Sequence, residues 1–230
     1  MAPGGPTPDT GGSHCKGPPM YQLLSAKPSP YARKVRIQLA EKGIPFDLIT
    51  EVPWNSDTQT PRWNPLEKLP VLICPDGSSV FESRLINEWI EARHPEPALM
   101  PADMDARFAV KRIEVICDGA CDALILQLFE NARPEDHRSQ PWIDRQRRKV
   151  DGALRELARV VGDRGFCVGD RFTLADVATG TLLGYLKVRW PHLDWPQQYP
   201  NLAAFSERIE QRPSFAGSRP TTQVISDRVV

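Results

Sequence analysis

The sequence predicts an α+β protein in which a mixed domain of strands and helices precedes a bundle of helices. Short apolar runs bounded by Gly, Pro and Asp, typical of strands, occur only within residues 20–94. Residues 95–104 are rich in proline and lack a periodic pattern, as expected of a linker. In residues 105–215 apolar side chains recur at helical spacing. We expect residues 1–19, mostly Gly, Pro, Ser and Thr, to be a disordered extension, and residues 216–230 to be an irregular tail.

Composition excludes several classes of function. The chain has 230 residues, with Lys plus Arg and Asp plus Glu equal at 29 each, so its overall charge predicts no nucleic acid or membrane partner. No apolar run is long enough to span a membrane and no secretory signal is recognisable, so we expect a cytoplasmic protein. The five cysteines are odd in number and the four histidines are scattered, which predicts neither a disulfide framework nor a metal site.

The first elements form a β-α-β unit. A strand is predicted over residues 21–24 and a helix over residues 30–42, with Pro30 suited to its first position and Gly43 to its end. A second strand follows over residues 46–51. The short connections predict a right-handed crossover between the two strands.

A β-β-α unit follows after an irregular link. Strands are predicted over residues 71–74 and 79–81, on either side of the turn sequence Pro75-Asp76-Gly77-Ser78. An amphipathic helix is predicted over residues 83–93.

The second domain needs only helices. Apolar residues at helical spacing predict one long helix around residues 113–128 and another over residues 143–161. Thr173 and Asp176 form a capping-box pattern, which marks the start of a third helix. A last helix is predicted over residues 202–212.

Two segments of the first domain describe a site for a short, extended peptide. A cis peptide bond before Pro70 would turn the N–H and C=O of Leu69 outward, where a peptide can pair with them. Glu82 supplies a carboxylate for an ammonium group, and the Ser83 hydroxyl with the first free N–H groups of its helix suits a carboxylate. The site therefore fits a peptide that carries both groups at one end.

Four motifs, in order over about residues 20–215, resemble those of the cytosolic glutathione transferase superfamily, most of all its small bacterial serine-type members. They are Ser29 to Arg36, Asn64 to Leu72, Glu82-Ser83, and Gly169-Asp170 through Asp176. The resemblance implies a thioredoxin-like N-terminal domain of order β-α-β-α-β-β-α and an all-α helical-bundle C-terminal domain. It also implies glutathione as co-substrate, no cofactor, and a homodimer.

The resemblance places the activating hydroxyl at Ser29, before Pro30 at the positive end of the first helix. A hydroxyl donor there stabilises the thiolate of glutathione over its thiol. The glutathione contacts that the motifs imply are Lys68, Leu69, Pro70, Glu82 and Ser83. Trp54, in the loop after the second strand, is a further candidate contact through its indole N–H. Helix capping stays open as an alternative role for Ser29, Glu82 and Ser83, as does a solvated surface position for Lys68. Glu67 stands where relatives carry glycine, and it places a negative charge near the expected glycyl carboxylate.

The pocket for the second substrate is expected at the domain boundary. Its candidate residues are Tyr31, Asp118, Asp122, Tyr185 and Arg189. For the two aspartates, a solvated helix face is the favoured interpretation. For Tyr185 and Arg189, packing between the domains fits the spacing equally well.

The predicted function is that of a glutathione transferase acting on a small, largely apolar electrophile, with detoxification as its role. One alternative is a non-catalytic module that binds proteins with the same fold. Another is a different glutathione-dependent reaction, namely ether cleavage, isomerisation, or peroxide or disulfide reduction. Dithiol exchange at the first turn is excluded, because Ser29 and Ala32 take the positions where redox relatives carry cysteines.

Overall fold

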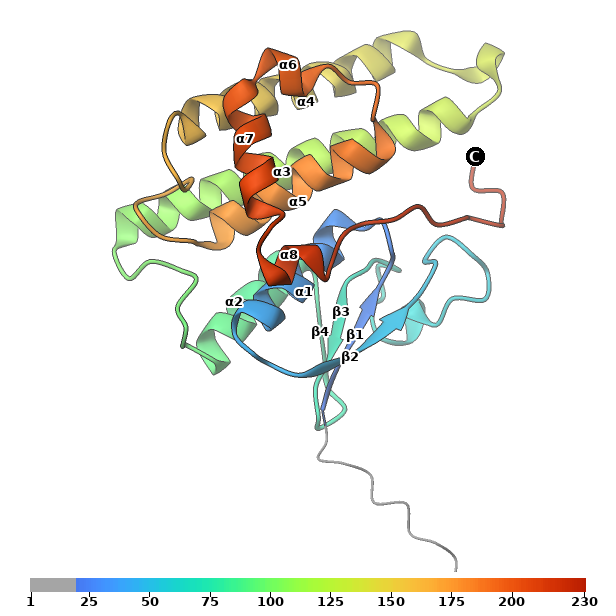
Figure 1. Ribbon diagram of the computed structural model, residues 1–230. Helices are drawn as coiled ribbons and strands as arrows, with labels where there is room; N and C mark the ends of the chain where they lie inside the picture. Colours follow the sequence, from blue (N-terminus) through green and yellow to red (C-terminus); the bar gives the residue numbers. More distant parts are fainter. Residues whose placement is uncertain (1–19) are drawn as a thin grey trace, which may run out of the picture.

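A four-stranded mixed sheet forms the outer layer of the N-terminal domain in this computed structural model, which describes residues 20–230 (Figure 1). The predicted disordered extension, residues 1–19, lies outside the described residues. The strand order is β2-β1-β3-β4, with β1 and β2 parallel and the other pairs antiparallel. The strands are β1 (Tyr21–Ser25), β2 (Phe46–Thr50), β3 (Val71–Ile73) and β4 (Ser79–Phe81).

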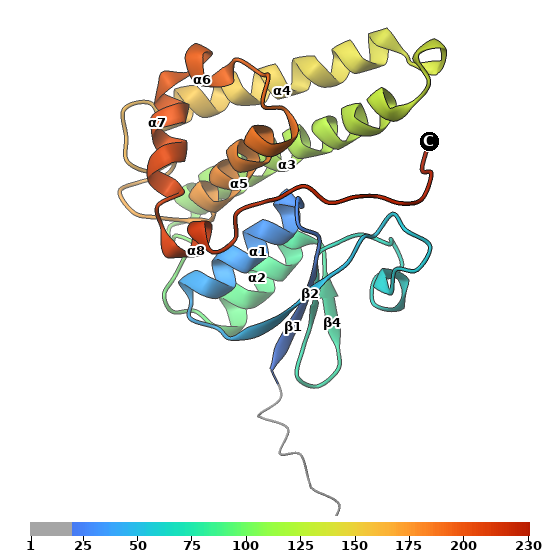
Figure 2. The ribbon, with the colours of Figure 1, turned by 45° about the vertical axis from the view of Figure 1, so that its right-hand side comes forward.

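Two helices, α1 (Pro30–Glu41) and α2 (Ser83–Arg93), lie side by side between the sheet and the helical domain (Figure 2). They pack on the sheet because both carry an apolar face at helical spacing. The buried residues of this core are Leu23, Val35, Leu39, Leu72, Ile86 and Ile90.

The thioredoxin-like fold class is confirmed, with one difference between β2 and β3. The α-helix that the resemblance implied there is wrong, because the segment forms only a single turn of 3-10 helix, η1 (Thr60–Arg62). Pro53, Pro61 and Pro65 lie in or next to this segment and have no backbone N–H. Because a helix interior needs these donors, the prolines disfavour a longer helix here.

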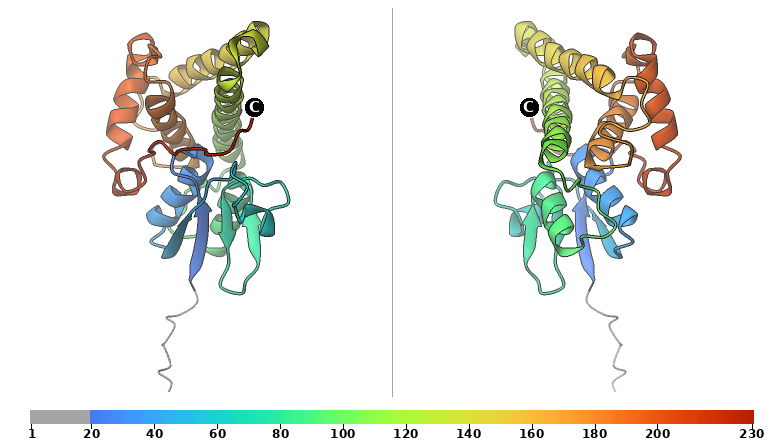
Figure 3. Two further views of the ribbon diagram at one scale, coloured as in Figure 1. Left: turned by 90° about the vertical axis from the view of Figure 1, so that its right-hand side faces the viewer. Right: turned by 90° about the vertical axis from the view of Figure 1, so that its left-hand side faces the viewer.

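Helices are the only regular elements in the described part of the C-terminal domain (Figure 3). Helix α5 is its centre, and every residue from Leu174 to Leu186 is buried. Helix α3 packs against both α4 and α5. The elements are α3 (Met104–Ala132), η2 (Glu135–His137), α4 (Gln140–Val161), α5 (Leu174–Arg189), α6 (Trp195–Gln198), α7 (Pro200–Ile209) and α8 (Pro213–Ala216).

The start of α5 is held by the buried carboxylate of Asp176. It accepts hydrogen bonds from the N–H of Thr173 at 2.8 Å, from the Thr173 hydroxyl at 3.0 Å, and from the N–H of Cys167 at 2.7 Å. These bonds satisfy donors that a helix start leaves free, so the predicted helix start is confirmed.

The segment between the domains is anchored rather than loose. Leu99 and Met100 are buried in the core of the helical domain, and the C=O of Leu99 accepts a 3.0 Å hydrogen bond from the N–H of Leu174. The two domains therefore meet over a fixed interface, in which α1 packs on α5. None of the helices in residues 20–230 is long and apolar enough to cross a membrane.

Candidate functional site

A cavity of about 530 Å³ lies between the two domains. The N-terminal domain contributes the β1–α1 turn, the segment before β3 and the start of α2, while α3 and α5 form the opposite wall. Pro70 is buried beside the cavity and does not line it. The other sequence-predicted site residues all line it: Ser29, Tyr31, Trp54, Lys68, Leu69, Glu82, Ser83, Asp118, Asp122, Tyr185 and Arg189.

Ser29 is the N-cap of α1, at the cavity wall. Its hydroxyl oxygen accepts a hydrogen bond from the N–H of Ala32 at 3.2 Å. The capping role is therefore real, but it uses only a lone pair of the oxygen. The hydroxyl proton stays available for donation into the cavity, so capping and thiolate stabilisation are compatible in one side chain.

The segment before β3 presents backbone groups to the cavity. The Leu69-Pro70 peptide bond is cis, which is the isomer that the expected peptide site requires. Within the described residues no hydrogen bond uses the N–H or C=O of Leu69. The buried side chain of Asn64 holds the segment, donating to the C=O of Lys68 at 2.7 Å and accepting from the N–H of Leu66 at 2.9 Å. Sequence reasoning gave Asn64 no role, although an Asn-Pro step is a known turn signal.

Glu67 lies beside Lys68 with a positive φ of 55°. This is the left-handed region that favours glycine, which explains the glycine expected here from the resemblance. The Glu67 side chain is exposed at the cavity, so its charge lies near whatever binds to Lys68.

Glu82 and Ser83 open helix α2 at the cavity floor. Glu82 has a φ of 73°, an uncommon value for a residue with a side chain and a frequent feature of functional sites. Its carboxylate accepts from the N–H groups of Arg84 at 3.2 Å and Leu85 at 3.4 Å. Ser83 is buried, with its hydroxyl 3.4 Å from Glu82. The two residues thus cap the helix and face the cavity at once.

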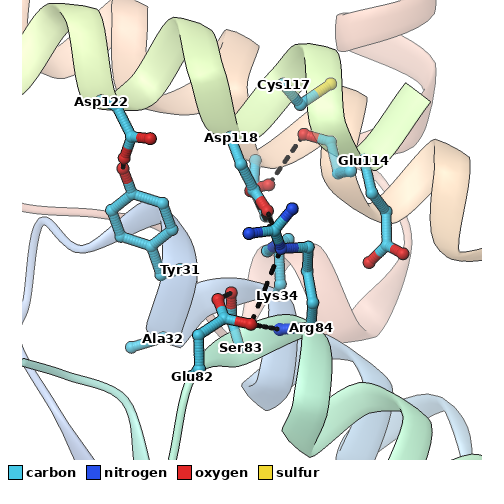
Figure 4. A network of polar contacts seen from close by, with 12 residues as sticks. Tyr31, Ala32, Lys34, Glu82, Ser83, Arg84, Glu114, Cys117, Asp118 and Asp122 are labelled. Carbon is cyan, nitrogen blue, oxygen red and sulfur yellow. Dashed lines mark hydrogen bonds and ion pairs between the residues drawn. The ribbon is translucent and has the colours of Figure 1, made fainter. Parts of the chain in front are cut away.

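A series of ion pairs connects the start of α2 to α3 (Figure 4). The ammonium of Lys34 contacts the Asp118 carboxylate at 2.7 Å, and both side chains are largely buried. Arg84 lies between Asp118, 3.5 Å away, and Glu82, 3.6 Å away. Burial raises the pKa of Asp118, and the charge of Lys34 opposes that rise. The interpretation of Asp118 as a solvated surface residue is therefore wrong.

Tyr31 points from α1 toward α3, where its hydroxyl donates to the exposed carboxylate of Asp122 (Figure 4). Burial raises the pKa of Tyr31 far above its ordinary value, and the nearby carboxylates add to the effect. The phenol therefore stays protonated and its proton is engaged by Asp122. Of the two hydroxyls at the start of α1, those of Ser29 and Tyr31, only that of Ser29 therefore has a proton to offer.

An apolar surface covers much of the remaining wall. Trp54 meets Phe129 edge to face, with ring centroids 4.4 Å apart, and Trp54 keeps 46% of its surface exposed. Ile125 and Leu128 of α3 line the same region. An apolar ligand group fits against this surface.

The C-terminal tail, residues 217–230, also contributes to the cavity lining, a role that the sequence did not predict. The Gln223 side chain accepts from the N–H of Lys27 and donates to the C=O of Glu51, each at 3.0 Å. Gln223 and Ile225 both line the cavity. The tail carries no periodic pattern, so nothing in the sequence indicates that it returns to the first domain (Figure 1).

No side chains in residues 20–230 cluster in a way that would hold a metal ion. The cysteines of the helical core are buried, and burial raises the pKa of Cys117 to about 12. Their thiols are therefore unreactive near neutral pH.

Comparison with family models gives matches in both domains. The model described as glutathione S-transferase, N-terminal domain, matches residues 28–93, and that of the C-terminal domain matches residues 140–208. The matched ranges include most of the N-terminal wall of the cavity and, on the opposite wall, Tyr185 and Arg189 of α5, whereas α3 and the tail lie outside both ranges.

Three relatives span most of the chain. A glutathione S-transferase structure from Methylobacterium radiotolerans, in complex with glutathione sulfonate, is 61% identical with a TM-score of 0.90, covering 92% of this chain and 100% of that one. The uncharacterized GST-like protein YibF of Escherichia coli K12 is 36% identical, covering 86% of this chain and 98% of YibF. A maleylacetoacetate isomerase of Pseudomonas aeruginosa is 27% identical, covering 83% and 91%.

Proposed function

The chain belongs to the glutathione transferase family, and on that premise we propose that it activates glutathione for attack on a small electrophile. One observation supports this most directly: the Ser29 hydroxyl, the backbone of Leu69 and the Glu82-Ser83 pair line one cavity. A non-catalytic module would not need these groups together. The structure of the Methylobacterium radiotolerans relative contains glutathione sulfonate, which is consistent with glutathione binding in this chain.

The peptide would bind along the N-terminal wall. Leu69 would exchange main-chain hydrogen bonds with the cysteinyl unit, since its N–H and C=O have no partner within the described residues. Glu82 would bind the γ-glutamyl ammonium, and the Ser83 hydroxyl with the first N–H groups of α2 its carboxylate. Lys68 would meet the glycyl carboxylate, weakened by the charge of Glu67.

This pose places the thiol near Ser29 and the positive end of α1. Both favour the thiolate over the thiol, and each unit of pKa depression requires about 1.4 kcal/mol of differential stabilisation. The sulfur then attacks the electrophile on the side of the helical domain. A homodimer and a cytoplasmic location, as is usual for the family, complete the proposal.

Calorimetric titration with glutathione, together with the ultraviolet absorbance of bound thiolate across pH, tests the role of Ser29. We expect thiolate near neutral pH in the wild type and its loss in Ser29→Ala, with glutathione still bound. Ser29→Thr keeps the hydroxyl and should therefore retain the bound thiolate. Ser139→Ala is the matched control, because Ser139 is also an N-cap residue but lies outside the cavity.

The outcome separates the candidate functions. No glutathione binding by the wild type would favour the protein-interaction module. Binding with a thiolate that survives in Ser29→Ala would refute the role of Ser29. Isomerisation, the activity named for the Pseudomonas aeruginosa relative, returns glutathione unchanged, whereas transfer consumes its thiol. Thiol titration during turnover therefore distinguishes these two reactions.

A further inference from the structure

Arg189 is a cation at the cavity that no carboxylate of residues 20–230 neutralises. It lies in the last turn of α5 and lines the cavity. Its Nε is buried and has no hydrogen-bond partner within residues 20–230. The carbonyl groups at the C-terminal end of α5 favour a cation there, but they leave this donor unsatisfied.

Three of the four acidic side chains that line the cavity are engaged elsewhere, and the fourth, Glu67, belongs to the N-terminal wall beside Lys68. Asp118 is paired with Lys34 and lies near Arg84, which also contacts Glu82. Asp122 accepts from the Tyr31 hydroxyl. Within the described chain, no ion pair includes Arg189, so its charge remains available to a ligand.

A second donor lies beside Arg189. Tyr185 precedes it by one helical turn, lines the same cavity and is only 3% exposed. Burial raises the pKa of Tyr185 while the charge of Arg189 opposes the rise, so the phenol stays protonated at neutral pH. A guanidinium and a phenol next to an apolar surface are suited to a carboxylate attached to an apolar group.

We propose that Arg189, assisted by Tyr185, forms an anion subsite, and that the electrophile carries a carboxylate next to an apolar body. This inference rests on the proposed function and changes the substrate class that the sequence predicted. The apolar part lies against Ile125 and Phe129 of α3, and the carboxylate lies against α5. Arg189 is thus a specificity-determining residue, while the thiolate is activated by groups of the other wall.

Two glutathione conjugates of similar size test the subsite: S-(2-carboxyethyl)glutathione and the neutral S-propylglutathione. We expect calorimetry to show that the wild type prefers the carboxylate conjugate by roughly 10- to 100-fold, the range for a hydrogen bond to a charged group. Arg189→Gln should abolish this preference and leave binding of S-propylglutathione unchanged within about twofold. Arg189→Lys keeps a charge and should retain part of the preference.

The matched control is Arg155→Gln, which removes the same charge from an exposed position on α4 outside the cavity. It should keep the full preference. Equal binding of the two conjugates by the wild type, or an unchanged preference in Arg189→Gln, would overturn the anion subsite while the proposed function stands. Failure of glutathione itself to bind would instead overturn both.

Discussion

The two walls of the cavity are built in different ways. The N-terminal wall consists of turns and helix caps whose hydrogen bonds join residues close in sequence, such as Ser29 with Ala32 and Asn64 with Lys68. The opposite wall consists of side chains from α3, α5 and the tail, which are distant in sequence. Backbone groups recognise a constant ligand, whereas side chains can vary without altering the fold. We therefore expect the first wall to bind a constant ligand and the second wall to set the choice of the second substrate.

The largest expected effect on stability comes from removing one charge of the buried ion pair that joins the two walls. Lys34→Met leaves the Asp118 carboxylate without its closest partner in a mostly buried position. We expect the free energy of unfolding, measured by urea denaturation, to fall by about 3–5 kcal/mol.

The double variant Lys34→Met/Asp118→Leu provides the control. Replacing both charges with apolar groups should restore most of the lost stability, because no buried charge remains unpaired. If the double variant is as unstable as the single one, the loss comes from packing rather than from the charge.

An intermediate effect is expected where the tail touches the first domain. Gln223→Ala removes two hydrogen bonds to backbone groups, so we expect a loss of about 1–2 kcal/mol in unfolding free energy. Gln223 also lines the cavity, and on the proposed arrangement the tail borders the electrophile. KM for the electrophile should then rise by about 3- to 10-fold, equivalent to one such bond, while the glutathione Kd changes little.

Val224→Ala is the control for the tail, since the Val224 side chain is largely exposed. It should leave both constants unchanged. Equal weakening of glutathione and electrophile in Gln223→Ala would show that the tail supports both walls alike.

The smallest effect concerns a pair of charges away from the cavity. Glu41 of α1 accepts from Arg212 at 2.6 and 3.0 Å and from the Ser214 hydroxyl. Burial raises the pKa of Glu41, but these hydrogen bonds outweigh it and the folded-state pKa is lowered below 4.5. Its stabilisation is therefore present above the unfolded pKa and is lost as pH falls through the folded pKa.

Because the pair is partly exposed, we expect it to contribute less than about 1 kcal/mol. Thermal unfolding from neutral pH down to acid should show a shallower decrease of Tm in Glu41→Gln than in the wild type. Parallel curves would show that Glu41 does not titrate with folding.

The comparison of walls also explains how far the sequence could be interpreted. The start of α5 was predictable because Thr173 and Asp176 satisfy local donors. The proline before β3 raised the cis isomer at Pro70 as a condition, and the structure has it. The role of Asp118 was not predictable, because its partner Lys34 lies on another domain and no spacing rule connects them. The path of the tail was missed for the same reason.

By itself, the sequence predicted the four strands, the main helices, the family and most residues that line the N-terminal wall of the cavity, because caps, turns and helical spacing act over a few residues. Only the tertiary structure decided that Asp118 is buried against Lys34, that Arg189 has no acidic partner within the described chain, and that Gln223 pins the first turn. These features depend on contacts between segments far apart in the chain, and such contacts leave no local pattern in a single sequence.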